Sequence, residues 1–328
     1  MPSTINDAIQ NPLRNYLESQ NLPPGTIQLS LGDPCKSGFR PPEGVIEAVK
    51  EVLESDDVNA FAYAPASGLT SAKEAIASRT VYRGLYKAED VVLTHGCTGA
   101  LDMAIKWTCR PGDSILLPRP GFPLYASLAS MHGVQVVYYD LDSDWKINLE
   151  HIRKSIQPST RAWLVNNPSN PCGVVLKKQE LVGIAELAKE LNVILIADEV
   201  YEDITLDECY MPLASLTDHT VITCGSLSKR FLLPGWRLGW LLVHDPSQIC
   251  DRITLKDLAG ISLGPCFLIQ AALPKILSTI DCKYKKSLKD TLTENARVAS
   301  ATFSNLGFRF TMPQGALYMM VKCMISLD

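Results

Sequence analysis

Seven short apolar stretches between residues 91 and 243 limit the possible folds more than any other feature of the sequence. Nearly all their residues are apolar or β-branched, as expected for strands that are buried on both faces. These predicted strands are residues 91–94, 114–117, 134–139, 162–166, 193–197, 221–224 and 239–243. Helical patterns, including those at 100–109 and 178–192, lie between many of them. The alternation predicts an α/β protein whose mainly parallel, seven-stranded sheet is covered by helices on both faces.

The composition is that of an ordinary globular protein and excludes several classes of partner. The 328 residues carry a net charge of −4, which gives no basic footprint for nucleic acid or an anionic membrane surface. No apolar run approaches membrane-spanning length. The ten cysteines form no C-x-x-C pair, so we interpret them as reduced thiols rather than as a disulfide or metal framework. These features predict a cytoplasmic protein with no metal, nucleic-acid or membrane partner.

Ligands of such sheets bind beyond the carboxyl ends of the strands, so the residues that follow each predicted strand are the candidate site residues. Gly96, Cys97 and Thr98 follow the first strand and open a helix. A small-residue turn there presents free backbone N–H groups to a phosphate, although a purely structural turn has the same appearance. Phe122 follows the second strand in a proline-rich loop, where it can stack on a flat ring or fill the core.

Polar residues follow the fourth and fifth predicted strands. Asn170 lies in a turn with two Asn-Pro pairs, where its amide can reach an oxygen or serve the turn alone. Asp198 comes directly after a wholly apolar strand, and Tyr201 follows shortly after it. A carboxylate is costly to bury without a partner, and a protonated ring nitrogen would be such a partner. A structural carboxylate, paired elsewhere in the fold, is the alternative.

The stretch after the sixth predicted strand contains Ser226, Lys229 and Arg237. A lysine at the mouth of a buried sheet is costly to bury, because its ammonium group is strongly hydrated. Burial lowers the pKa of the amine, and the neutral amine can attack a carbonyl to form a Schiff base. Ser226 and Arg237 can hold an anion such as a phosphate. Alternatively, Lys229 and Arg230 are a surface pair on a loop.

These residues together supply every part of one cofactor site. The parts are an anion cradle, a stacking ring, a buried carboxylate, donors for a phenolate oxygen and a lysine that can form a Schiff base. A lysine combined with an aspartate for the pyridine nitrogen is the recurring protein signature of pyridoxal 5′-phosphate. A nicotinamide oxidoreductase is disfavoured, because the glycine fingerprint of dinucleotide-binding proteins is missing.

Longer phrases of the chain resemble fold-type I pyridoxal-phosphate aminotransferases of the aspartate aminotransferase superfamily. They are RPGFPLY (119–125), NNPSNPCG (166–173), ADEVY (197–201), GSLSKRFLLPGWRLGW (225–240), LGPC (263–266) and PQGALYMMV (313–321). The combination of NNPSNPCG with PGWRLGW is most similar to the tyrosine aminotransferase branch. The resemblance implies a large cofactor-binding domain with a mainly parallel sheet and a smaller α+β domain.

The resemblance implies a role for each candidate residue. Lys229 binds the cofactor as a Schiff base and later moves a proton, while Asp198 pairs with the pyridine nitrogen. Tyr201 and Asn170 contact the ring hydroxyl oxygen. The remaining ring and phosphate contacts are Gly96, Cys97, Thr98, Phe122, Ser226 and Arg237. Tyr63 is expected to reach the phosphate in the neighbouring subunit of a homodimer, and Gly32 to lie near the substrate carboxylate.

The resemblance also implies an activity. The expected reaction is the ping-pong transfer of an amino group from an L-amino acid to 2-oxoglutarate, with aromatic L-tyrosine as the expected donor. A pyridoxal-phosphate-dependent carbon–sulfur lyase on the same fold is one alternative, and an inactive aminotransferase remnant is another. Each would retain the same cofactor residues.

The expected domain organisation follows the family. Residues 1–45 are expected to contribute to the small domain, 46–285 to form the large domain, and 286–328 to begin the C-terminal small domain. Two short strand-like pieces, at 308–313 and 316–323, close the chain. The family has an arginine beyond this region that binds the substrate α-carboxylate, and no arginine follows Lys322. The small domain is therefore expected to be truncated at its C-terminus.

Overall fold

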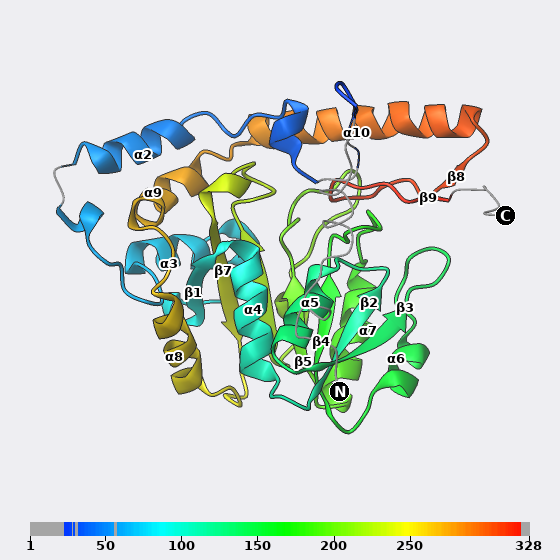
Figure 1. Ribbon diagram of the computed structural model, residues 1–328, viewed down its shortest axis with the longest axis horizontal. Coiled ribbons are helices and arrows are strands. Elements are labelled where there is room, and N and C mark those ends of the chain that lie inside the picture. The colour runs from blue at the N-terminus through cyan, green and yellow to red at the C-terminus, as the bar shows by residue number, and fades with distance from the viewer. Residues whose placement is uncertain (1–22, 28, 30–31, 56–57, 323–328) are drawn as a thin grey trace.

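The computed structural model describes residues 23–27, 29, 32–55 and 58–322. Its centre is a seven-stranded sheet with the strand order β1-β7-β6-β5-β4-β2-β3 (Figure 1). The strands are β1 (Val91–His95), β2 (Ser114–Arg119), β3 (Gln135–Asp140), β4 (Thr160–Asn166), β5 (Ile194–Asp198), β6 (Val221–Ser226) and β7 (Leu238–His244). Each of them coincides with a predicted strand to within about two residues at either end. The predicted α/β fold is therefore confirmed.

Several strands continue past their apolar stretch into polar residues at the carboxyl end. Asp198 pairs with Asn166 across β5 and β4, and Ser226 pairs with Gly239 across β6 and β7. Strand pairing uses backbone N–H and C=O groups, so a polar side chain does not end it. Asp198 and Ser226 are consequently the last residues of rigid strands rather than members of loops.

The direction of β7 decides which residues meet at the carboxyl edge of the sheet. β7 runs antiparallel to β1 and β6, whereas the other neighbouring strands are parallel. The first residues of β7 therefore lie at the same edge as the last residues of β1 and β6, with His95 opposite Leu238 and Ser226 opposite Gly239. Arg237, directly before β7, is placed at that edge as a result.

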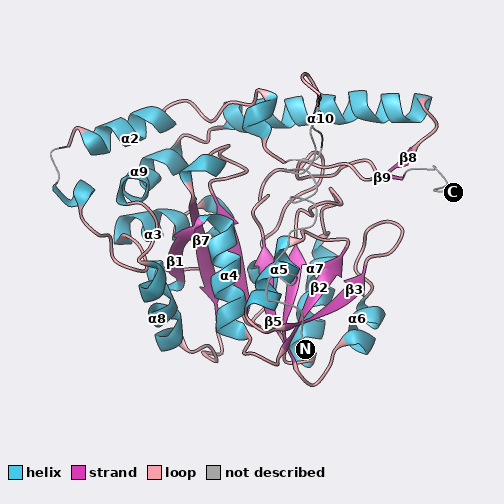
Figure 2. Cartoon of the chain, viewed as in Figure 1, coloured by secondary structure: helices cyan, strands magenta, loops and turns pink. Residues whose placement is uncertain are grey.

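Helices surround the sheet and cover both of its faces (Figure 2). The main ones are α2 (Val45–Leu53), α3 (Thr70–Ala77), α4 (Gly96–Thr108), α5 (Leu124–Met131), α6 (Leu149–Ser155), α7 (Lys178–Glu190), α8 (Arg252–Ser262), α9 (Phe267–Ser278) and α10 (Cys282–Asn305). Leu195 and Ala197 of β5 share a core cluster with Leu181 of α7, whereas Ile196 shares another with Leu101 of α4. This alternation with a period of two explains why the strands are apolar throughout.

The helix α10 lies across one end of the sheet and leads to a small second sheet (Figure 1). That sheet consists of β8 (Arg309–Phe310) and β9 (Val321–Lys322), which pair antiparallel. The strand expected at 316–323 is therefore wrong for residues 316–320, which form no strand. Residue 323 lies outside the described residues.

Hydrogen bonds to other loops hold Ala316, the first residue of the expected longer strand, and the two residues before it. Gln314 N and Gly315 N both donate to Gly173 O, at 2.7 and 3.0 Å. Ala316 N donates to Ile204 O at 3.0 Å. These backbone groups are thus used in contacts with the loops that follow β4 and β5, and are not available for a strand ladder.

The expected domain boundaries stay a prediction. The boundary between residues 285 and 286 falls inside α10, so a continuous helix crosses it. Residues 1–22 of the expected N-terminal segment and 323–328 of the expected small domain lie outside the described residues. Within the described ranges, no single helix is long and apolar enough to cross a membrane, although α8 and α9, bent by 115°, pass that test when taken together.

Candidate active site

The candidate residues follow one another along the carboxyl edge of the sheet. Because β1, β7, β6 and β5 are successive neighbours, Gly96, Arg237, Ser226 and Asp198 stand at successive positions on this edge. They are far apart in the sequence, and the antiparallel direction of β7 is what adds Arg237 to the group. The edge thus combines a cation, a hydroxyl, a carboxylate and the start of a helix.

Two glycines allow the backbone to pack closely around Arg237. A Cβ atom on Gly96 would lie 2.4 Å from Arg237 Nη2, and one on Gly239 would lie 2.3 Å from the Gly96 carbonyl carbon. Gly96 also has a φ of +71°, which other residues rarely adopt. Arg237 donates to Pro234 O at 2.8 Å and to His95 O at 3.3 Å. These bonds hold the exposed guanidinium beside the start of α4 and leave further N–H donors for a ligand.

The start of α4 has the properties of an anion site. No side chain caps this 13-residue helix at His95. The first N–H groups, those of Gly96, Cys97 and Thr98, therefore lack a helical partner, and the positive end of the helix dipole lies beside them. Cys97 is buried and Thr98 is exposed. Together with Ser226 and Arg237, this helix start matches the donor set that a phosphate needs.

Asp198 is a buried carboxylate whose hydrogen-bond partners are neutral. Its side chain accepts from Tyr125 Oη at 2.6 Å, from Val200 N at 3.2 Å and from Cys97 Sγ at 3.5 Å. Among the described residues, none makes an ion pair with it, and the residue is 3% exposed. Burial raises the pKa of the Asp198 carboxyl, and the hydrogen bond from Tyr125 opposes the rise. The site therefore lacks the cationic partner that an ionised, buried carboxylate favours.

Lys229 lies near Asp198 and is half-buried. Its Nζ donates to Gly32 O at 2.5 Å and lies 5.7 Å from the centre of the Tyr201 ring. Burial lowers the pKa of the Lys229 amine, while the charges of Asp33 and Asp198 oppose this effect. A lysine with a lowered pKa is neutral more often and is then a nucleophile and a proton acceptor.

The structure adds Tyr318, which the sequence interpretation did not assign to the site. Its hydroxyl lies 2.7 Å from that of Tyr201, and the two rings meet edge to face with centres 5.7 Å apart. A Cβ atom on Gly32 would lie 2.2 Å from Tyr318 Oη, so a side chain there would displace the Tyr318 hydroxyl. No local pattern identifies Tyr318, because its partner Tyr201 is 117 residues away in the sequence.

The loop that carries Asn170 contacts the Tyr318 segment. A Cβ atom on Gly173 would lie 2.4 Å from Tyr318 O, and Gly173 has a φ of +68°. Asn170 N donates to Asn166 Oδ1 at 2.6 Å, which ties this loop to the end of β4. Asn170 itself is half-buried. The Asn-Pro turn is thus held between the sheet and the C-terminal segment.

The last two candidate aromatic residues differ in their surroundings. Phe122 is half-buried and meets Tyr125 edge to face, with ring centres 5.6 Å apart. Tyr125 in turn donates to Asp198, so Phe122 lies near the carboxylate. Tyr63 is 86% exposed and, in the described part of this single chain, has no hydrogen bond or ring contact with the other candidates. Its contact across a dimer stays a prediction.

Known proteins share both the sequence and the fold of this chain. The family model described as "Aminotransferase class I and II" matches residues 24–325. Tyrosine aminotransferase from Homo sapiens is 38% identical and covers 98% of this chain, which spans 73% of that protein. The solved structure of alanine aminotransferase from Pyrococcus furiosus is 30% identical, with a TM-score of 0.90 over 99% of this chain and 85% of that one. The solved structure of tyrosine aminotransferase from Leishmania infantum is 25% identical, with a TM-score of 0.88 over 96% of this chain and 81% of that one.

The family model extends over far more than half of the chain, and it includes each of the candidate residues described above. The seven-stranded sheet, the buried Asp198 and the half-buried Lys229 all lie within the matched residues. The chain therefore belongs to the class I and II aminotransferase family and is an aminotransferase.

Proposed function

We propose that the chain uses pyridoxal 5′-phosphate to transfer the amino group of an aromatic L-amino acid, L-tyrosine first, to 2-oxoglutarate. One observation carries the proposal: a half-buried lysine, Lys229, lies near a buried carboxylate, Asp198, that has no cation paired with it among the described residues. Family membership supports the cofactor, and the relatives named tyrosine aminotransferase support the donor.

The residues present fit this cofactor. The start of α4, Ser226 and Arg237 would hold the phosphate, because uncapped helical N–H groups and a guanidinium suit a dianion. Asp198 would accept a hydrogen bond from the protonated pyridine nitrogen and gain the cation that it lacks. Phe122 would stack on the ring. When bound, pyridoxal 5′-phosphate supplies an aldehyde that takes up the amino group and a ring that accepts electrons from the substrate carbon.

The protein's own groups then have distinct tasks. The Nζ atom of Lys229, with its lowered pKa, would accept the proton from the substrate α-carbon. It would then donate this proton to the cofactor carbon that takes up the amino group. Tyr201 and Asn170 would fix the orientation of the ring through its hydroxyl oxygen. Because the amino acid and the 2-oxo acid would use the same site in turn, we expect ping-pong kinetics.

We also propose that the active form is a homodimer. Phe61 and Tyr63 are 89% and 86% exposed, which is unusual for two neighbouring aromatic side chains on one segment. A second copy packed on this segment would cover both rings and would allow Tyr63 to reach the phosphate site of that copy.

Labelling of the lysine tests the proposal. The purified chain is incubated with pyridoxal 5′-phosphate, reduced with borohydride and mapped by peptide analysis, and we expect the pyridoxyl group on Lys229. Lys229→Ala should lose the label and reduce turnover of L-tyrosine with 2-oxoglutarate by at least about 100- to 10,000-fold, the usual contribution of a general acid–base group. Lys256→Ala, at an exposed position of α8, is the matched control and should retain the label on Lys229 and the turnover of L-tyrosine.

Two outcomes would contradict the proposal. A pyridoxyl group on any other lysine would remove Lys229 from its role. Formation of pyruvate and ammonia from a cysteine conjugate, without any need for a 2-oxo acid, would instead indicate a carbon–sulfur lyase.

A further inference from the structure

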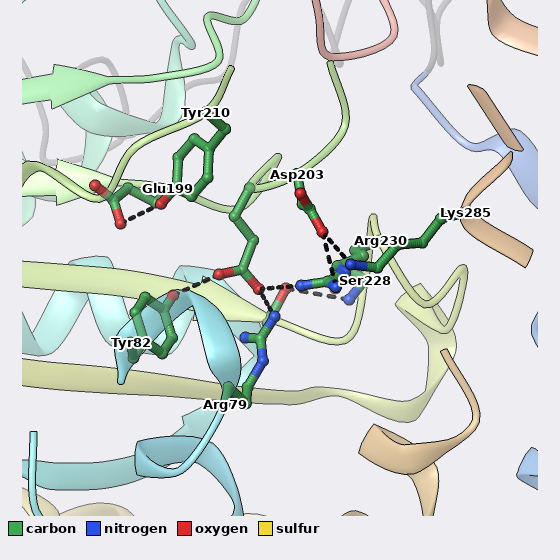
Figure 3. A network of polar contacts seen from close by, with 10 residues as sticks. Arg79, Tyr82, Glu199, Asp203, Tyr210, Ser228, Arg230 and Lys285 are labelled. Carbon is green, nitrogen blue, oxygen red and sulfur yellow. Dashed lines mark hydrogen bonds and ion pairs between the residues drawn. The ribbon is translucent and has the colours of Figure 1, made fainter. Parts of the chain in front are cut away.

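A network of charged side chains, shown in Figure 3, includes residues that closely follow Tyr201 and Lys229 in the sequence. Its members come from four separate parts of the chain and are Arg79, Glu202, Asp203, Arg230 and Lys285. Arg230 Nη2 lies 2.9 Å from Asp203 Oδ2, and Arg230 Nη1 lies 3.8 Å from Glu202 Oε1. Arg79 Nη2 lies 2.5 Å from the same Glu202 oxygen, close enough for an ion pair although the angle is not that of a hydrogen bond.

The centre of this network is removed from water. The side chains of Arg79, Glu202 and Arg230 are 7%, 2% and 12% exposed. The Tyr82 hydroxyl donates to the second Glu202 oxygen at 2.6 Å. Removing charges from water costs free energy that their attraction often only balances, and an apolar core of the same volume is often as stable. The network is therefore not explained by a gain in stability. Its ion pairs can instead hold the segments that carry them in one arrangement.

The position of the network in the sequence indicates what this geometry fixes. Glu202 directly follows Tyr201, and Arg230 directly follows Lys229. The Arg230 contacts with Glu202 and Asp203 therefore join the two turns that carry Tyr201 and Lys229. Outside these contacts, each turn is closed by local hydrogen bonds, which are Ile204 N to Tyr201 O and Leu232 N to Lys229 O. A backbone bond from Glu199 N to Cys224 O at 3.0 Å joins the two segments before the turns begin, and beyond it the ion pairs of Arg230 link one turn to the other.

The helix α10 attaches to both turns at its first residues. Lys285 Nζ lies 2.8 Å from Asp203 Oδ2, and Tyr284 Oη donates to Arg230 O at 3.2 Å. Asp203 has a φ of +62°, which costs a non-glycine residue some backbone strain. Its two cationic partners, Arg230 and Lys285, hold it there.

We propose that Arg230 is a positioning residue, whose ion pairs with Glu202 and Asp203 set the distance between the Lys229 and Tyr201 turns. The inference rests on the proposed functions of Lys229 and Tyr201. Arg230 touches neither the substrate nor the cofactor in this assignment and acts only through its neighbours. A lysine does not replace it, because one ammonium group cannot reach two carboxylates as a guanidinium fork does.

The test uses Arg230→Met in the 328-residue chain loaded with pyridoxal 5′-phosphate. We expect kcat for L-tyrosine with 2-oxoglutarate to fall about 10- to 100-fold with little change in KM, because small misplacements of reacting groups are costly. The pH midpoint of the visible absorption of the bound cofactor should also shift, since the surroundings of the Lys229 nitrogen change. Arg230→Lys should restore less than half of the lost activity. Borohydride should still label Lys229.

The controls separate this inference from the proposed function. Arg153→Met removes an exposed arginine paired with Glu190 and should change neither kcat nor the pH midpoint. Asp203→Asn, at an exposed position, removes one partner of Arg230 and should also lower kcat, which tests the inference even if Arg230→Met does not fold. If Arg230→Met or Asp203→Asn folds, is labelled, and has the wild-type kcat and pH midpoint, the inference about Arg230 is wrong and the proposed function is unaffected. Absence of label in the wild-type chain would overturn the proposed function as well.

Discussion

Asp198, the last residue of β5, and Glu202, in the turn that follows, are two buried carboxylates with opposite surroundings. Glu202 faces Arg79 and Arg230 and accepts from Tyr82. Among the described residues, Asp198 accepts only from a hydroxyl, a thiol and a backbone N–H. Both residues are nearly inaccessible to water.

The difference shows how the protein uses buried charge. A buried carboxylate is stable in its ionised form only with charge compensation or several strong hydrogen bonds. The protein itself supplies the cations to Glu202, which makes that carboxylate part of the framework. It supplies none at ion-pair distance to Asp198 in the described structure, which leaves that carboxylate ready for a cationic ring. The end of β5 and the turn after it thus contain one structural and one ligand-directed acid.

The largest expected effect comes from exchanging each carboxylate for its amide. Asp198→Asn should lower kcat by about 100- to 5,000-fold, because losing one partner of a buried charge pair costs about 3–5 kcal/mol and each 1.36 kcal/mol is tenfold in rate. The cofactor-free variant should be as stable as the wild type, since the amide removes the cost of burying a charge. Steady-state kinetics and urea unfolding measure the two effects.

The matched variant Glu202→Gln should show the opposite balance. It leaves two arginines beside a neutral amide, and we expect about 3 kcal/mol of lost stability in urea unfolding of the cofactor-free protein. If Asp198→Asn lost as much stability as Glu202→Gln and kept its kcat, the distinction between the two acids would be wrong.

A third buried acid, Glu199, directly follows Asp198 and predicts how the stability of the protein depends on pH. It accepts from Tyr210 Oη at 2.6 Å and from Leu213 N at 2.8 Å, and burial raises the pKa of its carboxyl from 4.5 to about 8. A carboxyl whose pKa is raised in the folded state contributes stability that is present below pH 4.5 and is lost as the pH rises through about 8. We therefore expect the free energy of unfolding of the cofactor-free protein to fall across this range.

Glu199→Gln should remove this part of the pH dependence. Urea unfolding at about pH 5 and about pH 8.5 should show a decrease in the wild type, on the order of a few kcal/mol, that is much smaller in the variant. Glu150→Gln, on the surface at the start of α6, is the control and should follow the wild type. Equal slopes for Glu199→Gln and the wild type would show that another group titrates.

The smallest expected effect concerns the contact between Tyr201 and Tyr318. Tyr318→Phe removes a single hydroxyl from a pair 2.7 Å apart and keeps the ring contact. A hydrogen bond contributes about 0.5–1.5 kcal/mol net, so kcat/KM should fall about 2- to 10-fold. Tyr138→Phe, on the edge strand β3, should have no effect on kcat/KM. A wild-type kcat/KM for Tyr318→Phe would remove Tyr318 from the site.

The sequence by itself determined the sheet and the main candidate residues. The seven apolar stretches predict strands because only a sheet covered on both faces requires apolar side chains at every position. The strand ends predict the ligand side of the sheet, since parallel strands present their carboxyl ends together. Asp198, Ser226 and Lys229 follow from these two rules, because they lie shortly after apolar stretches of the sequence.

The tertiary structure alone decided which distant residues meet. The antiparallel direction of β7 brings Arg237 beside Gly96, and no local pattern states a strand's direction. Tyr318 reaches Tyr201, and Arg79 reaches Glu202, through contacts between segments far apart in the chain. Side-chain periodicity reports which face of an element is buried, but it does not report which partner buries it. The neutral hydrogen-bond partners of Asp198 and the cationic partners of Glu202 therefore became visible only in the folded chain.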